Sequence, residues 1–91
     1  MSRPSRIAVL ASGRGSNLQA LLDASANGRL DAAIVGVFGD QPMARALQRV
    51  HDSLRWSRDA RSYARRADFD AELAAAVAGS DPDWVVCAGY M

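Results

Sequence analysis

Apolar and polar positions alternate along the chain in two different rhythms. Continuous apolar runs of strand length stand at 7–11, 32–38 and 84–88, with a shorter candidate strand at 54–56. Between them, apolar residues recur at helical spacing, at about 17–26, 43–50 and 69–77. Strands that are apolar throughout are covered on both faces, and strands that alternate with helices form parallel sheets. The pattern therefore predicts an α/β fold: a Rossmann-like parallel sheet with helices on both faces and right-handed crossovers.

Residues that favour turns and helix ends mark the boundaries of these segments. Asn27 and Gly28 are suited to close the first helix in left-handed geometry. Pro42 can occupy the first turn of the second helix, and Asp68 is placed to cap the third. Gly79–Pro82 ends the third helix, because glycine and proline rarely continue one. With no repeat and no internal linker, the chain is predicted to form one small domain.

A glycine loop, Gly13–Asn17, joins the first strand to the first helix. The first N–H groups of a helix have no intrahelical partner, and the helix dipole places partial positive charge there. Glycines allow a tight turn and let an anion approach the backbone without meeting a Cβ atom. Ser16 and Asn17 add a hydroxyl and an amide as further hydrogen-bond partners. The loop is therefore predicted to cradle a phosphate.

The well-known nucleotide loops fit this stretch badly. A P-loop needs a lysine after its second glycine, and the chain contains no lysine. The dinucleotide fingerprint needs a small residue at position 18, where Leu18 stands. A loop for one terminal phosphate has fewer requirements and fits better. The alternative, a tight strand-to-helix turn with an ordinary N-cap and no ligand, stays open.

A parallel sheet places its functional edge at the carboxyl ends of its strands. The loop at 13–17, the turn at 38–41, the segment after Trp56 and the residues 89–91 should therefore converge on one rim. Asp40 ends the second strand, where it could bind a ribose or form an Asx turn. His51 is the single histidine, and its position favours a helix-end residue over a catalytic base.

Composition narrows the possible partners. The formal net charge is +1, and the eleven basic residues, all arginine, are scattered along the chain. Nucleic acid and acidic membrane surfaces are therefore not expected as partners. The single cysteine, Cys87, excludes an intrachain disulfide and a cysteine metal cluster, and its apolar setting predicts a buried, inert thiol. Since no segment has the length of a membrane span or the form of a secretory signal, a cytoplasmic protein is expected.

Four segments, in order, carry a resemblance to a known family: IAVLASGRGSNLQALL at 7–22, VFGD at 37–40, RADFDAEL at 66–73 and PDWVVCAGYM at 82–91. The chain resembles the glycinamide ribonucleotide formyltransferases of purine synthesis over its whole length. That family's enzymes are about twice as long, so residues 1–91 correspond to the nucleotide-binding N-terminal half of the domain. The resemblance implies formyl transfer from 10-formyltetrahydrofolate to the amine of 5-phosphoribosylglycinamide, with no metal.

The resemblance also assigns site residues. It implies that Gly15, Ser16 and Asn17 hold the phosphate of the ribonucleotide, and that Arg66 contacts 10-formyltetrahydrofolate. Met91 matches the first residue of the loop that receives the pterin. By residue type alone Arg66 would be a solvated arginine, although a planar guanidinium suits the anionic glutamate tail of a folate. The neighbouring Arg65 leaves a one-residue ambiguity.

The family's catalytic Asn, His and Asp lie in its second half, so no catalytic residue is expected within residues 1–91. Two other readings stay open beside the formyltransferase. One is a non-catalytic phosphate- or nucleotide-binding module, and the other is a different folate-dependent formyl enzyme. A dinucleotide-dependent oxidoreductase is disfavoured by Leu18.

Overall fold

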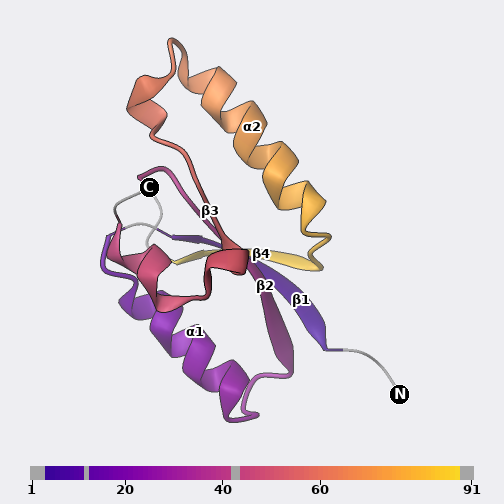
Figure 1. Ribbon diagram of the computed structural model, residues 1–91. Coiled ribbons are helices and arrows are strands. Elements are labelled where there is room, and N and C mark those ends of the chain that lie inside the picture. The colour runs from indigo at the N-terminus through magenta and orange to yellow at the C-terminus, as the bar shows by residue number, and fades with distance from the viewer. Residues whose placement is uncertain (1–3, 12, 42–43, 89–91) are drawn as a thin grey trace.

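A computed structural model describes residues 4–11, 13–41 and 44–88, which form a four-stranded parallel sheet between two helices (Figure 1). The strands are β1 (Ser5–Ala11), β2 (Ala32–Gly39), β3 (Arg55–Ser57) and β4 (Trp84–Ala88). The α-helices are α1 (Ser16–Ala26) and α2 (Arg66–Gly79), and the short 3₁₀ helices are η1 (Arg45–Arg49), η2 (Asp52–Leu54) and η3 (Ala60–Ser62). The predicted fold class is confirmed.

The strand order is β3-β2-β1-β4. The first three strands therefore follow one another outward from β1 to β3. The chain then returns through α2, which connects β3 to β4, and β4 pairs with the other edge of β1. This reversal is a topological switch point, the place where open α/β sheets bind their ligands. The carboxyl ends of the strands are aligned, because Ala11 pairs with Ala88 and Gly39 pairs with Ser57.

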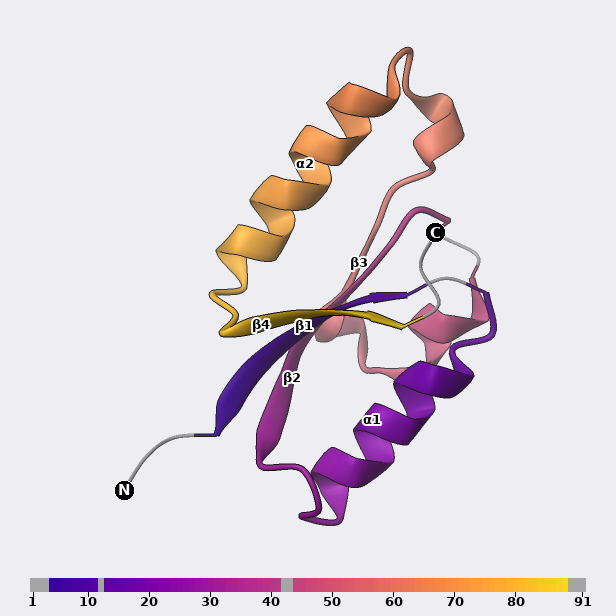
Figure 2. The same ribbon diagram turned by 180° about the vertical axis from the view of Figure 1, so that it is seen from behind.

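The sheet separates two apolar cores, and α1 and α2 cover opposite faces (Figure 2). Successive β1 side chains alternate between these faces, as a pleated strand requires. The core beneath α1 includes Ile7, Val9, Ala11, Leu18 and Val37. The core beneath α2 consists of Ala8, Phe38, Phe69 and Leu73, with partly buried neighbours that include Trp56, Ala76 and Val77. The predicted apolar face of the third helical segment is thereby confirmed.

Two predicted helix features are wrong in detail. The second helical segment is shorter than predicted and is the 3₁₀ helix η1, although the apolar positions Ala46, Leu47 and Val50 are all buried as the pattern predicts. Pro42, predicted to start it, lies outside the described residues. Asp68 does not cap α2: the N-cap is Arg65, and Asp68 lies within the first turn, where its charge suits the helix dipole.

Strand β4 differs from the expectation of a strand covered on both faces. Trp84 is 65% exposed and Val85 is 51% exposed, and Cys87 is exposed rather than buried. Within the described part of the chain, β4 pairs with β1 alone and no strand lies along its other edge. The apolar run at 84–88 therefore predicted the strand correctly, but the prediction that its side chains are buried on both faces is wrong.

Two further observations concern membranes and metal ions. In the described ranges, no helix is long and apolar enough to cross a membrane. The same ranges hold no group of three or more His, Cys, Asp or Glu side chains arranged to bind a metal ion.

Candidate functional site

The glycine loop between β1 and α1 uses both of its glycines for a backbone reason. Gly13 and Gly15 have φ angles of 65° and 78°, in the left-handed region that other residues rarely adopt. Gly15 is also buried against η1, where an added Cβ atom would lie 2.6 Å from Ala46 Cα. No side chain therefore fits at this position without a shift of the loop or of η1.

Gly15 is itself the N-cap of α1, and α1 has no side-chain cap hydrogen bond. Its carbonyl accepts the Gln19 N–H at 2.8 Å, which starts the helical ladder. The N–H groups of the first turn have no acceptor within the helix, and Ser16 and Asn17 beside them are exposed. The side-chain cap of the ligand-free alternative is therefore not formed here. An anion approaching this end would meet free donors and the positive end of the dipole.

The helix η1 lies beside the glycine loop and is hydrogen-bonded to it (Figure 1). The Ala46 N–H donates to the Gly13 carbonyl at 3.0 Å. The Arg49 side chain donates from Nε to the Arg14 carbonyl at 2.7 Å and from Nη1 to Gln19 Oε1 at 3.1 Å. Arg49 thus joins the loop to the first turns of α1. Sequence reasoning did not single it out, because nothing in its spacing separates it from the other arginines.

The predicted convergence of loops at one rim is confirmed for the described segments. The Arg58 N–H donates to the Gly39 carbonyl at 3.4 Å, and the Ala60 N–H donates to the Asp40 carbonyl at 3.1 Å. An added Cβ at Gly39 would lie 3.1 Å from the Ala11 carbonyl oxygen, so the turn after β2 lies beside the end of β1. Residues 89–91, the fourth predicted member of the rim, lie outside the described residues.

Asp40 stands at this rim with a buried side-chain oxygen. Its Oδ1 has no hydrogen-bond partner, and no hydrogen bond accepted by its carboxylate marks an Asx turn in the described part of the chain. A buried, unpaired carboxylate oxygen is costly, and it offers an acceptor to a donor group that comes near. The ribose-binding interpretation of Asp40 remains a prediction.

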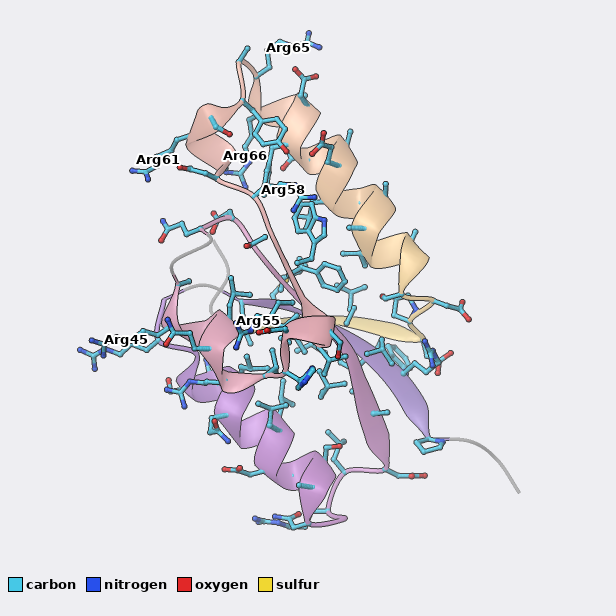
Figure 3. All side chains as sticks on the ribbon, in the orientation of Figure 1. Arg45, Arg55, Arg58, Arg61, Arg65 and Arg66 are labelled. Atoms are coloured by element: carbon cyan, nitrogen blue, oxygen red, sulfur yellow. The ribbon has the colours of Figure 1, made fainter. Side chains whose placement is uncertain are left out.

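Arg66 begins α2, and its side chain lies on the aromatic cluster between α2 and the sheet. Its guanidinium carbon is 4.9 Å from the Phe69 ring centroid, and its Nε donates to Asp70 Oδ1 at 3.1 Å. The neighbouring Arg65 pairs with Asp68 at 3.1 Å. Arg65 points away from the molecule, whereas Arg66 is turned toward the segment that carries Arg58 and Arg61 (Figure 3).

The arginines around the start of α2 do not form a general anion-binding patch. Three of them are paired with carboxylates on the protein surface, at Arg61–Asp59, Arg65–Asp68 and Arg66–Asp70. The hydrogen bond from the Arg61 side chain lowers the pKa of Asp59, which keeps that carboxylate ionised. The positive charge of these three arginines is therefore offset by neighbouring carboxylates. The aromatic contact gives Arg66 a fixed position that Arg65 lacks.

Comparison with known proteins decides the family. The Formyl transferase family matches residues 5–91.

The chain belongs to the formyl transferase family.

Several relatives of this formyl transferase chain are similar over nearly all of it. The phosphoribosylglycinamide formyltransferase of Schizosaccharomyces pombe is 38% identical over 96 residues, which cover 93% of this chain and 46% of the relative. The enzyme of the same name from Mycobacterium tuberculosis H37Rv is 37% identical over 91 residues, covering 99% of this chain and 42% of the relative. The chain therefore spans about half the length of the curated relatives it matches.

Solved structures agree on the fold. Glycinamide ribonucleotide transformylase 1 from Geobacillus kaustophilus superposes with a TM-score of 0.89 at 33% identity, over 98% of this chain and 48% of that one. The Symbiobacterium toebii transformylase 1 also gives 0.89, at 36% identity, over all of this chain and 44% of that one. The arrangement of strands and helices described above thus matches a little under half of each of these transformylase structures.

The predicted site residues fall into two groups within this formyl transferase chain. Gly15, Ser16 and Asn17 lie together at the start of α1 and form the open end of the helix. Arg66 lies apart from them, at the start of α2 beyond the carboxyl end of β3 (Figure 1). Met91, predicted to contribute to the folate site, lies outside the described residues.

Proposed function

We propose that this chain is the nucleotide-binding N-terminal half of a phosphoribosylglycinamide formyltransferase. The whole protein would transfer a formyl group from 10-formyltetrahydrofolate to the amine of 5-phosphoribosylglycinamide in purine synthesis. The observation that carries the proposal is the open N-terminus of α1, shaped by two left-handed glycines and free of a side-chain cap. The names of the relatives, similar over more than nine tenths of the chain, supply the substrate.

In this proposal the chain binds and orients, and it does not carry the proton transfer. The phosphate of the ribonucleotide would accept hydrogen bonds from the first N–H groups of α1, with the Ser16 hydroxyl and the Asn17 amide beside them. The phosphate does not react, so its binding energy serves to place the amine where it can attack the formyl carbon. The tetrahedral oxyanion formed by that attack needs donors and a proton acceptor, which we assign to the part of the protein beyond residue 91.

The formyl donor would be held in part by Arg66. Its guanidinium is charged at every relevant pH, and its contact with Phe69 holds it in place while leaving half of the side chain, 52%, exposed. A folate's glutamate carboxylate would share or replace the Asp70 partner in a charge-assisted hydrogen bond. Met91 stays a predicted pterin contact, and the cytoplasm is the compartment we propose.

Formyl transfer by the whole protein tests the proposal. The full-length protein is purified, incubated with 10-formyltetrahydrofolate and 5-phosphoribosylglycinamide, and assayed for the formylated ribonucleotide and tetrahydrofolate. We expect transfer to the ribonucleotide amine. Release of formate without transfer would indicate a different folate-dependent formyl enzyme. Binding of the ribonucleotide without any turnover of the donor would indicate a non-catalytic phosphate-binding module, and either result would overturn the proposal.

A further inference from the structure

Among the described residues, the long-range hydrogen bonds to the glycine loop come from η1. Gly13 and Arg14 are exposed, and an added Cβ at Gly13 would meet no atom within 4 Å. Glycines lose more conformational freedom on ordering than other residues, so a loop built on two of them needs external contacts to keep one geometry. Those contacts come from Ala46, through its N–H, and from the Arg49 side chain.

Arg49 makes a contact that a single point charge cannot make. Its Nε donates to the Arg14 carbonyl in the loop, and its Nη1 donates to the Gln19 side chain one turn into α1. Gln19 in turn donates from Nε2 to Asp23 Oδ1 at 2.9 Å, which fixes the orientation of its amide. The planar guanidinium therefore sets the position of the loop relative to the helix that follows it.

The charge of Arg49 is placed where helix stability alone would not favour it. A cation beside the first turn of a helix opposes the helix dipole, and α1 has no acidic residue in that turn to offset it. The hydrogen bonds to the Arg14 carbonyl and the Gln19 side chain, and not the stability of α1, therefore account for the position of this guanidinium.

We infer that Arg49 is a positioning residue that holds the 13–15 loop in its phosphate-binding geometry. The inference rests on the proposed function, because it assigns a role within the same site. Arg49 acts through the loop carbonyl and the Gln19 amide, and the backbone N–H groups of α1 make the contact with the phosphate. Loss of the guanidinium should leave the fold intact and let the loop sample geometries in which those N–H groups no longer converge.

Kinetics of matched variants in the full-length protein test this role. Arg49→Ala should raise the KM for 5-phosphoribosylglycinamide about tenfold, with the KM for 10-formyltetrahydrofolate unchanged. Arg49→Lys keeps the charge but loses the planar fork, so it should remain closer to Arg49→Ala than to the wild type. Arg45→Ala is the control, because Arg45 lies on the same 3₁₀ helix and points outward (Figure 3). It removes an equal charge and should behave as the wild type does.

A substrate without the phosphate separates positioning from a general structural effect. Against dephosphorylated glycinamide riboside, the loop contributes nothing, so wild type and Arg49→Ala should have the same kcat/KM. A loss of equal size on both substrates would overturn the inference, as would a ribonucleotide KM for Arg49→Ala within twofold of the wild type. Full recovery by Arg49→Lys would also overturn it, because charge alone would then suffice.

The outcomes distinguish this inference from the proposed function. If the wild-type protein transfers formyl groups and Arg49→Ala does so with unaltered constants, only the role of Arg49 fails. If the wild type shows no transfer, the proposed function fails, and binding of inorganic phosphate is compared by calorimetry in the two proteins. Weaker phosphate binding by Arg49→Ala would still support the loop-positioning role, and equal binding would refute it.

Discussion

Substitution of Asn17 by aspartate separates phosphate binding from helix stability, because the two should change in opposite directions. Asn17 is exposed in the first turn of α1, and the substitution is nearly isosteric. A carboxylate at a helix N-terminus stabilises the helix by roughly 0.3 to 1 kcal/mol. The same carboxylate repels a bound phosphate. Asn17→Asp should therefore fold at least as stably as the wild type and bind the ribonucleotide much less tightly.

The size of the binding loss follows from simple electrostatics. Two unit charges about 4 Å apart in water interact with about 1 kcal/mol, and a phosphate monoester carries roughly −1.5 to −2 charges. Loss of the amide donor adds about 1 kcal/mol. The sum of about 3 kcal/mol corresponds to about a hundredfold, and screening by salt reduces it toward tenfold. We expect a ribonucleotide KM raised between roughly tenfold and a hundredfold, with the smaller effect at high salt.

Asn27→Asp is the matched control at the other end of the same helix. Asn27 is the C-cap of α1, where an added negative charge opposes the dipole, but its Oδ1 already accepts hydrogen bonds from the Arg29 N–H and Nε, so a carboxylate there keeps a cationic partner. This variant should change the free energy of unfolding by less than about 1 kcal/mol and keep the wild-type ribonucleotide KM. Thermal unfolding and steady-state kinetics are measured on both variants. An unchanged KM for Asn17→Asp, or equal KM changes for both variants, would refute the placement of the phosphate at α1.

The remaining predictions concern Arg66, the α2 core and the isolated half. Arg66→Ala should raise the KM for 10-formyltetrahydrofolate roughly tenfold to a hundredfold, with the ribonucleotide KM nearly unchanged, as expected for a charge-assisted contact of about 1.5 to 3 kcal/mol. Phe69→Ala should lower the free energy of unfolding by about 3 to 5 kcal/mol, because the ring is fully buried between α2 and the sheet. Residues 1–91 alone should catalyse no formyl transfer and should associate in sedimentation, because β4 exposes Trp84 and Val85 along an unprotected edge.

Each of these outcomes has a control in the same chain. Arg65→Ala is the matched control for Arg66→Ala. If Arg65→Ala alone raises the KM for 10-formyltetrahydrofolate, the assignment of the folate contact to Arg66 is wrong by one residue. Ala74 lies on the exposed side of α2, so Ala74→Gly measures how much a weaker helix former alone lowers the free energy of unfolding. The loss of stability in Phe69→Ala should exceed that value, because it also includes the loss of core packing. A monomeric, well-folded fragment of residues 1–91 would contradict the exposed-edge argument, and turnover by it would contradict the absence of catalytic groups.

The structure also changes the reason why a side chain at Gly15 should be harmful. Sequence alone suggested that a Cβ there would occupy the place of the phosphate. In the structure the Cβ would instead meet Ala46 of η1, so a substitution displaces the loop and does not directly block the ligand. Gly15→Val therefore tests folding and binding together. Asn17→Asp instead tests phosphate binding in a protein that folds at least as stably as the wild type.

The sequence by itself determined the order and type of most elements. Continuous apolar runs of strand length at 32–38 and 84–88 predict strands, and the structure has β2 and β4 there. Gly28, with a φ angle of 81°, closes α1 as the Asn27-Gly28 pair predicted. The loop with its two glycines was visible as well, because left-handed turns demand that residue type. These features are local, so the residues that cause them are adjacent in the sequence.

Only the tertiary structure decided which distant residues act on the loop and how far each strand is covered. Ala46 and Arg49 reach the glycine loop across some 30 residues of sequence, and no local pattern marks either of them. The exposure of Cys87 depends on which neighbours stand beside β4, and apolar composition does not encode that. Arg66 and Arg65 were equivalent by residue type until the ring of Phe69 distinguished them. Contacts between remote segments depend on the packed arrangement of all the elements, so they follow from the fold as a whole.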